Sequence, residues 1–150
     1  MTFAFTDAEV DFVRAHPLGR LATASLAGEP DVVAVLCSYR RSLGVFLTGS
    51  GALDRTRRYH NARRNPRFSL VFDDLVWEPY TIRGVKVTGS IEVRTADDTL
   101  NLGATGVPLL VMRPERKWSW GIEEPAIDDT GTFSLRIDGG PATPLTTLPT

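Results

Sequence analysis

The sequence contains few residues of the kinds that form disulfide frameworks or metal sites. Its 150 residues include one cysteine, Cys37, which therefore has no disulfide partner within the chain. The two histidines, His16 and His60, do not have the spacing of metal ligands, so we expect no metal site. No segment approaches the roughly 18 apolar residues of a membrane span, and MTFAFTDAEV has no basic region followed by an apolar stretch. These absences predict a cytoplasmic protein that is neither exported nor inserted into a membrane.

A large charge of either sign is also absent, because 17 Lys and Arg oppose 18 Asp and Glu, for a net charge of −1. No global field would steer the protein toward nucleic acid or an anionic membrane, and no familiar nucleic-acid motif is present, so we expect no nucleic-acid partner. The local distribution differs. Residues 55–67 read RTRRYHNARRNPR, with six arginines and one histidine but no carboxylate. We expect an anion to meet this segment.

The length and composition predict one folded domain, since 42% of the residues are apolar and 23% are charged. Thr6 and Glu9 have the spacing of a capping box, which predicts a helix from about Asp7 to Ala15 that ends before Pro17. The basic segment is expected to form a second helix that ends near residues 65–66.

Alternating apolar residues predict strands over most of the chain between residues 19 and 93. The segments RLATASL and DVVAVLCSY should pair as a hairpin, and LGVFLT, RFSLVFD and GVKVTGSIEV should follow as further strands. VPLLVM, KWSWGI and TFSLRI are expected to add two or three more. The predicted fold is mainly β, a closed antiparallel barrel with short helices, over residues 1–137. Residues 138–150, rich in Pro, Thr and Gly, are expected to form an extended or disordered tail.

The strongest candidate for chemistry is the segment that runs from Thr48 through a glycine loop to Arg58. A flexible loop before a cationic helix favours phosphate, because backbone N–H groups and arginine side chains both point at the anion. The alternative is a solvated basic face, but such helices usually alternate charge signs. No conventional catalytic set is visible, so catalytic residues stay unassigned and any reactivity must come from a cofactor.

The three tryptophans are candidates for ligand or interface contacts. Trp118 and Trp120 should share one face of a strand, and we expect one of them to fill the core. Trp77, in the segment LVWEPY, is expected to contact a flat ligand or a second subunit.

Four segments together resemble a known family: LGRLATASLAGEPDVVAV, TRRYHNARRNPRFSLVFDD, RGVKVTGSIEV and RPERKWSWG. They are similar to pyridoxamine-phosphate-oxidase-like F420-dependent oxidoreductases, the group B flavin/deazaflavin oxidoreductases, over roughly Asp7 to Ile122. The resemblance implies a split antiparallel β-barrel of the FMN-binding type and a homodimer with cofactor sites at the interface. The cofactor it implies is coenzyme F420, with FMN as the alternative.

The resemblance also implies roles for particular residues. The cofactor phosphate and acidic tail would be held by Arg55, Thr56, Arg57, Arg58 and Asn61. Strand residues that include Val33 and Thr48 would lie along the ring system, and Trp77 and Trp120 would reach it from the second subunit. The implied activity is hydride transfer from F420H2 to an electron-poor C=C of an organic metabolite such as a tetracycline-like polycycle. An FMN-dependent oxidase or reductase and a non-catalytic F420 storage protein are the alternatives.

Overall fold

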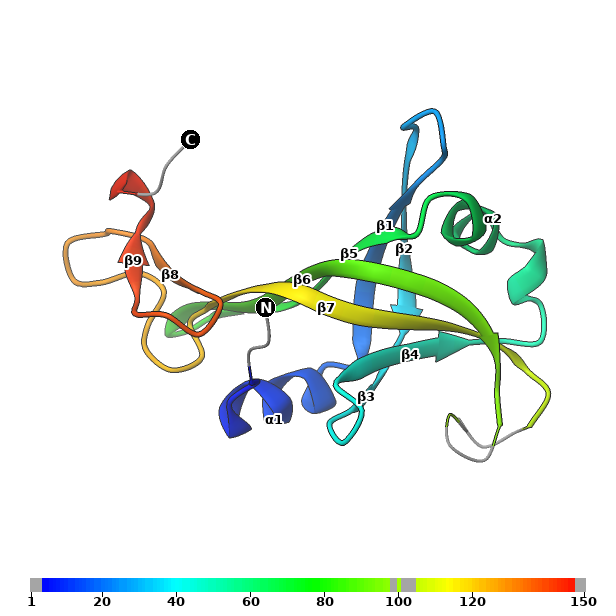
Figure 1. The fold of residues 1–150 in the computed structure, drawn as a ribbon. Coiled ribbons are helices and arrows are strands. Elements are labelled where there is room, and N and C mark those ends of the chain that lie inside the picture. The colour runs from blue at the N-terminus through cyan, green and yellow to red at the C-terminus, as the bar shows by residue number, and fades with distance from the viewer. Residues whose placement is uncertain (1–3, 98–99, 101–104, 148–150) are drawn as a thin grey trace.

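Tight turns and antiparallel hairpins build most of the fold. The computed structural model describes residues 4–97, 100 and 105–147 (Figure 1). The strands follow the order β2-β1-β5-β6-β7-β4-β3 in one sheet, with β8 paired to β7 and β9 paired to β8. The elements are α1 (Asp7–Ala15), β1 (Leu18–Ala24), β2 (Pro30–Leu36), β3 (Ser38–Arg40), β4 (Val45–Gly49), η1 (Leu53–Arg55), α2 (Arg57–Arg64), β5 (Arg67–Trp77), β6 (Tyr80–Thr95), β7 (Pro108–Trp120), β8 (Ser134–Ile137), β9 (Thr143–Pro144) and η2 (Leu145–Thr147).

The sheet curls around one main apolar core, and β2 and β3 form its two edges. Alternate residues of β5 and β6 face this core, as the sequence pattern predicted. The buried set includes Leu21, Phe46, Phe68, Leu70, Phe72, Val85, Val87 and Ile91, each at most 4% exposed. The predicted fold class, a mainly β split antiparallel barrel with short helices, is confirmed.

Helix α1 begins and ends as predicted. The Glu9 backbone N–H donates to Thr6 Oγ1 and the Thr6 N–H donates to Glu9 Oε2, both at 3.1 Å, which completes the capping box. Glu9 is only 1% exposed because its carboxylate also contacts Lys117 Nζ of β7 at 2.6 Å. The start of the helix is therefore fixed to the barrel by a buried ion pair.

Strand β7 contains two of the predicted segments and corrects one expectation. VPLLVM and KWSWGI lie in the single strand Pro108–Trp120, which pairs along β6 with a register shift between Thr88 and Gly89. With β8 it agrees with the two or three further strands that the sequence predicted. The prediction that Trp118 or Trp120 fills the core is wrong, since Lys117 and Ser119 face inward and both tryptophans are half-buried on the other face.

The C-terminal segment returns alongside the barrel strands. β9 pairs with β8 through Ser134 and Pro144, and Asp138 Oδ1 accepts a hydrogen bond from the Lys117 backbone N–H at 2.8 Å. β8 and Asp138 thus contact β7, whose end reaches away from α2 with β5 and β6, and β9 joins the structure through β8 (Figure 1). A separate tail from residue 138 stays a prediction, and residues 148–150 lie outside the described residues.

Candidate anion site at the start of helix α2

The backbone that leads into α2 passes close to β7 at Gly49. At Gly49, the last residue of β4, a Cβ would lie 2.5 Å from Leu109 Cδ2 and 2.7 Å from the Pro108 carbonyl oxygen, so only glycine fits. η1 then leads to Thr56, the N-cap of α2. The Thr56 hydroxyl accepts from the Tyr59 N–H at 3.3 Å and donates to the Leu53 carbonyl at 2.6 Å. Thr56 thus shapes the helix start and satisfies one of its free N–H groups.

The first turn of α2 is positively charged and has few internal partners. It contains no acidic residue, and its N–H groups before Tyr59 have no partner within the helix. Arg57 lies 3.5 Å from Glu29, but both side chains are more than half exposed, so this ion pair is weak. Arg55 is exposed at the end of η1. Three arginines therefore stand within four residues of the positive end of the helix dipole.

Arg58 carries the most informative atom of this site. Its Nε is buried and has no hydrogen-bond partner among the described residues. Leaving a buried N–H unsatisfied costs on the order of 1–3 kcal/mol, and more for a charged group. A phosphate oxygen beside Arg58 would remove this cost, so the residues at the helix start fit an anionic ligand.

Asn61 has a structural contact that the sequence did not reveal. Its side chain is 6% exposed, and Nδ2 donates to Thr23 Oγ1 of β1 at 3.1 Å. Asn65 Nδ2 donates to the Ser25 carbonyl at 3.3 Å. These two bonds hold α2 against β1 and so fix the direction of its arginines; a direct contact between Asn61 and a ligand stays a prediction.

A hollow of about 390 Å³ continues from α2 toward the β1–β2 turn. It is lined by Ser25, Leu26, Ala27, His60, Asn61 and Arg64. Sequence reasoning missed the turn residues. The available signal was Leu26, an apolar residue within a polar turn, which is 76% exposed.

The remaining predicted residues fall into two places. Val33 packs partly buried against the core, and Thr48 is 4% exposed on β4. Trp77 is 71% exposed at the end of β5, and the Trp120 ring crosses Gly84, where a Cβ would lie 2.1 Å from the ring. Figure 1 shows this end of the hairpin opposite α2. One protomer therefore does not bring the two tryptophans to the arginines.

Two further observations concern the described residues only. No group of three or more His, Cys, Asp or Glu side chains is placed to hold a metal ion there. None of the helices in this part of the chain has the length and apolarity needed to cross a membrane.

The sequence profile of the pyridoxamine 5'-phosphate oxidase family matches residues 5–108, which is more than half of the chain. The chain belongs to this family. A relative from Streptomyces rimosus, named 5a,11a-dehydrotetracycline/5a,11a-dehydrooxytetracycline reductase, is 28% identical over 120 residues, which cover 79% of this chain and 84% of the relative. The family assignment thus agrees with the resemblance seen in the sequence.

Solved structures agree on the fold. A putative pyridoxamine 5'-phosphate oxidase from Lactobacillus delbrueckii superposes with a TM-score of 0.61 at 20% identity, covering 77% of this chain and 94% of that one. The conserved hypothetical protein Rv2991 from Mycobacterium tuberculosis gives 0.62 at 22% identity, covering 79% and 86%. The heme storage protein HutZ from Vibrio cholerae gives 0.55 at 15% identity, covering 70% and 86%. At these identities the likeness concerns the fold alone.

Proposed function

We propose that this protein is an F420H2-dependent reductase that acts on an electron-poor C=C of an organic metabolite. The observation that carries the proposal is the start of α2, where Arg58 Nε is buried with no hydrogen-bond partner among the described residues and where Arg55 and Arg57 stand next in the sequence. When bound, the reduced deazaflavin supplies the hydride. The protein holds the reacting carbons in contact, and positioning of this kind is worth roughly 7–11 kcal/mol.

The arrangement of positive charge favours F420 over FMN. FMN carries one phosphate, for which Arg55, Arg57 and Arg58 would suffice. F420 carries a phosphodiester and a glutamate tail, and the 390 Å³ hollow beside α2 offers His60 and Arg64 for such an extension. A polycyclic enone is the favoured acceptor because the Streptomyces rimosus relative is named as a reductase of dehydrotetracyclines.

A second copy of the chain is part of this proposal. Leu18, Val32 and Leu36 are 54%, 66% and 69% exposed on neighbouring strands, and Leu18 pairs directly with Leu36. An apolar face of this kind on a soluble protein usually marks an interface. We propose that a second copy covers it and brings its Trp77 and Trp120 toward the start of α2.

The test is a tryptophan-fluorescence titration with F420 and, separately, with FMN. Removing charge-assisted hydrogen bonds costs about 1.5–3 kcal/mol, so Arg58→Ala should weaken F420 binding by about 10- to 100-fold. Arg67→Ala is the matched control, because this exposed arginine already pairs with Glu115 at 2.7 Å and lies outside α2. Its F420 affinity should stay within about threefold of the unaltered protein.

Each result has a separate meaning. Tighter binding of FMN than of F420 would identify an FMN-dependent oxidase or reductase. Binding of F420 without turnover of dehydrotetracycline by F420H2 would indicate storage, and binding of neither cofactor would refute the cofactor site. Light scattering of the loaded protein tests the homodimer, which predicts twice the 16.5 kDa of one chain.

A further inference from the structure

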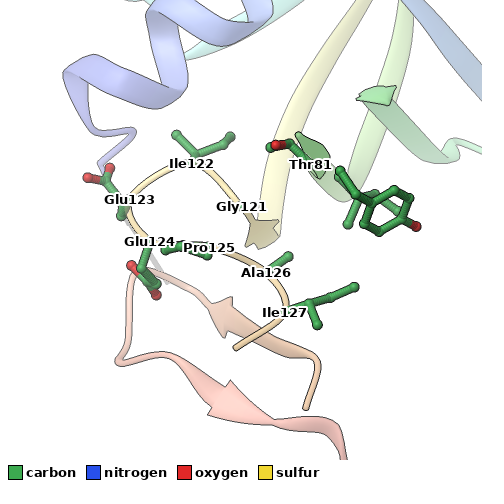
Figure 2. Close-up of a pocket in the computed structure, with 10 residues that line it drawn as sticks. Thr81, Gly121, Ile122, Glu123, Glu124, Pro125, Ala126 and Ile127 are labelled. Carbon is green, nitrogen blue, oxygen red and sulfur yellow. The ribbon is translucent and has the colours of Figure 1, made fainter. Parts of the chain in front are cut away.

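A second hollow lies at the far end of the molecule from α2, where β6 extends beyond β7. β7 ends at Trp120 opposite Gly84, so Tyr80–Arg83 have no β7 partner. The chain turns at Gly121, where φ is +70° and a Cβ would lie 2.1 Å from the Ile82 carbonyl oxygen. Residues 122–127 then arch away and enclose about 390 Å³, which we name the tip hollow (Figure 2).

Apolar side chains and one aromatic ring contribute most of the residues that line the tip hollow, next to Thr81, Glu123 and Glu124. Ile82, Ile122, Pro125, Ala126 and Ile127 are among its lining residues. Tyr80, also in the lining, is 53% exposed, and its ring centroid lies 5.8 Å from that of the 71% exposed Trp77. Its volume falls within the range of roughly 300–1,000 Å³ typical of small-molecule sites. Two exposed aromatic rings beside an apolar hollow favour a flat ring system.

The charges around the tip hollow exclude an anionic ligand. Within the described chain, no Lys, Arg or His lines it. Its two carboxylates are engaged elsewhere: Glu124 pairs with Arg136 at 2.8 Å, and Glu123 Oε1 accepts from Thr6 Oγ1 at 2.5 Å. Figure 2 shows both glutamates on the outer side of the loop, away from Thr81. A phosphate would find no cation to pair with among these lining residues, whereas an uncharged ring could pack against the isoleucine and proline side chains.

We propose that the tip hollow binds the ring system of the hydride acceptor, an uncharged flat polycycle. This inference rests on the proposed function and assigns the acceptor to a place distinct from the anion site. The end of the β5–β6–β7 sheet that carries the tip hollow and helix α2 lie at opposite ends of one protomer (Figure 1), so the proposal requires the acceptor held by one copy to reach the cofactor held by the other. The residues around the tip hollow then determine which acceptors are reduced.

The experiment fills the tip hollow with a larger side chain and measures the Kd for a ring probe, the Kd for F420 and the KM for the acceptor. Ile127, which is 37% exposed in its lining, is changed to tryptophan, and Leu43→Trp, at a 47% exposed position in the β3–β4 turn, is the matched control. Acridone, an uncharged fluorescent tricycle, is titrated by fluorescence anisotropy, with anionic anthracene-2-sulfonate as the comparison. The other two constants are the F420 Kd and the KM for dehydrotetracycline.

We expect Ile127→Trp to weaken acridone binding and raise the acceptor KM by at least about tenfold, with an F420 Kd within twofold. Tyr80→Ala should weaken acridone about two- to tenfold, because an aromatic contact is worth about 0.5–1.5 kcal/mol. Leu43→Trp should change nothing. The inference is wrong if the unaltered protein does not bind acridone, binds the sulfonate equally well, or keeps its acceptor KM in Ile127→Trp. If the protein binds acridone but not F420, the proposed function is refuted, and the assignment of the tip hollow to the hydride acceptor fails with it. The tip hollow would then still be a site for uncharged aromatic ligands.

Discussion

Replacing Lys117 by methionine removes the ammonium group from an ion pair whose two side chains are each 1% exposed. Lys117 Nζ lies 2.6 Å from Glu9 Oε2 and 3.0 Å from the Ala4 carbonyl oxygen, so both acceptors lose the bond from the ammonium, and among the described residues the Glu9 carboxylate keeps only the neutral Thr6 N–H at 3.1 Å as a donor to Oε2. Breaking a buried pair from one side costs about 3–5 kcal/mol. With an m-value of about 2 kcal/mol/M, the urea midpoint should fall by about 1.5–2.5 M.

A double-mutant cycle separates the charge from the packing. Glu9→Gln keeps an oxygen for the Thr6 N–H but removes the carboxylate that pairs with the Lys117 ammonium, so it should also lose about 3 kcal/mol or more. The double variant Glu9→Gln/Lys117→Met removes both charges of this pair and should be at least about 2 kcal/mol more stable than the less stable of the two single variants. Unfolding free energies from urea titrations give all four values. Losses that simply add in the double variant would refute the view that an unpaired buried charge causes the damage.

Three further predictions concern other parts of the barrel. A side-chain hydrogen bond from Arg83 lowers the pKa of Asp74, so the stability that this carboxylate adds is present above the unfolded pKa of about 4 and is lost as the pH falls further. Asp74→Asn should therefore be less stable than the unaltered protein at pH 7, and thermal unfolding should show the difference shrinking as the pH falls below about 4; a difference that stays constant would contradict this. Gly84→Ala should cost about 1–3 kcal/mol because its Cβ meets the Trp120 ring, and the cost should shrink in a Trp120→Ala background, as chemical unfolding can show. Burial raises the pKa of the Cys37 thiol to about 12, so a disulfide reagent at pH 8 should label it only after unfolding, and rapid labelling of the native protein would be inconsistent with this burial.

The sequence predicted the local elements well where short-range chemistry decides them. The Thr6 and Glu9 capping box predicted α1, because both hydrogen bonds lie within four residues. Alternation predicted the inward faces of β5 and β6, since side chains of a strand point to opposite sides. The end of α2 at Asn65 likewise follows from Pro66.

Long-range pairing explains what the sequence did not predict. The sequence pattern did not decide whether VPLLVM and KWSWGI form one strand or two, and continuous pairing with β6 keeps Pro108–Trp120 extended. The same pairing fixes which side faces inward, so Lys117 is buried and Trp118 is not. A lysine is expected on the surface unless its ion-pair partner is known, and the partner of Lys117, Glu9, is 108 residues away in the sequence.

The sequence by itself determined the fold class and the basic start of α2, because hydrophobic alternation, capping and a run of arginines without carboxylates are local properties of the chain. Only the tertiary structure decided that Arg58 Nε is buried with no hydrogen-bond partner in the described part of the chain, that Asn61 bonds β1, and that the end of β5, which carries Trp77, lies far from α2 in the same protomer. These facts depend on how distant strands are brought together, and a single sequence does not encode such distances in any local pattern.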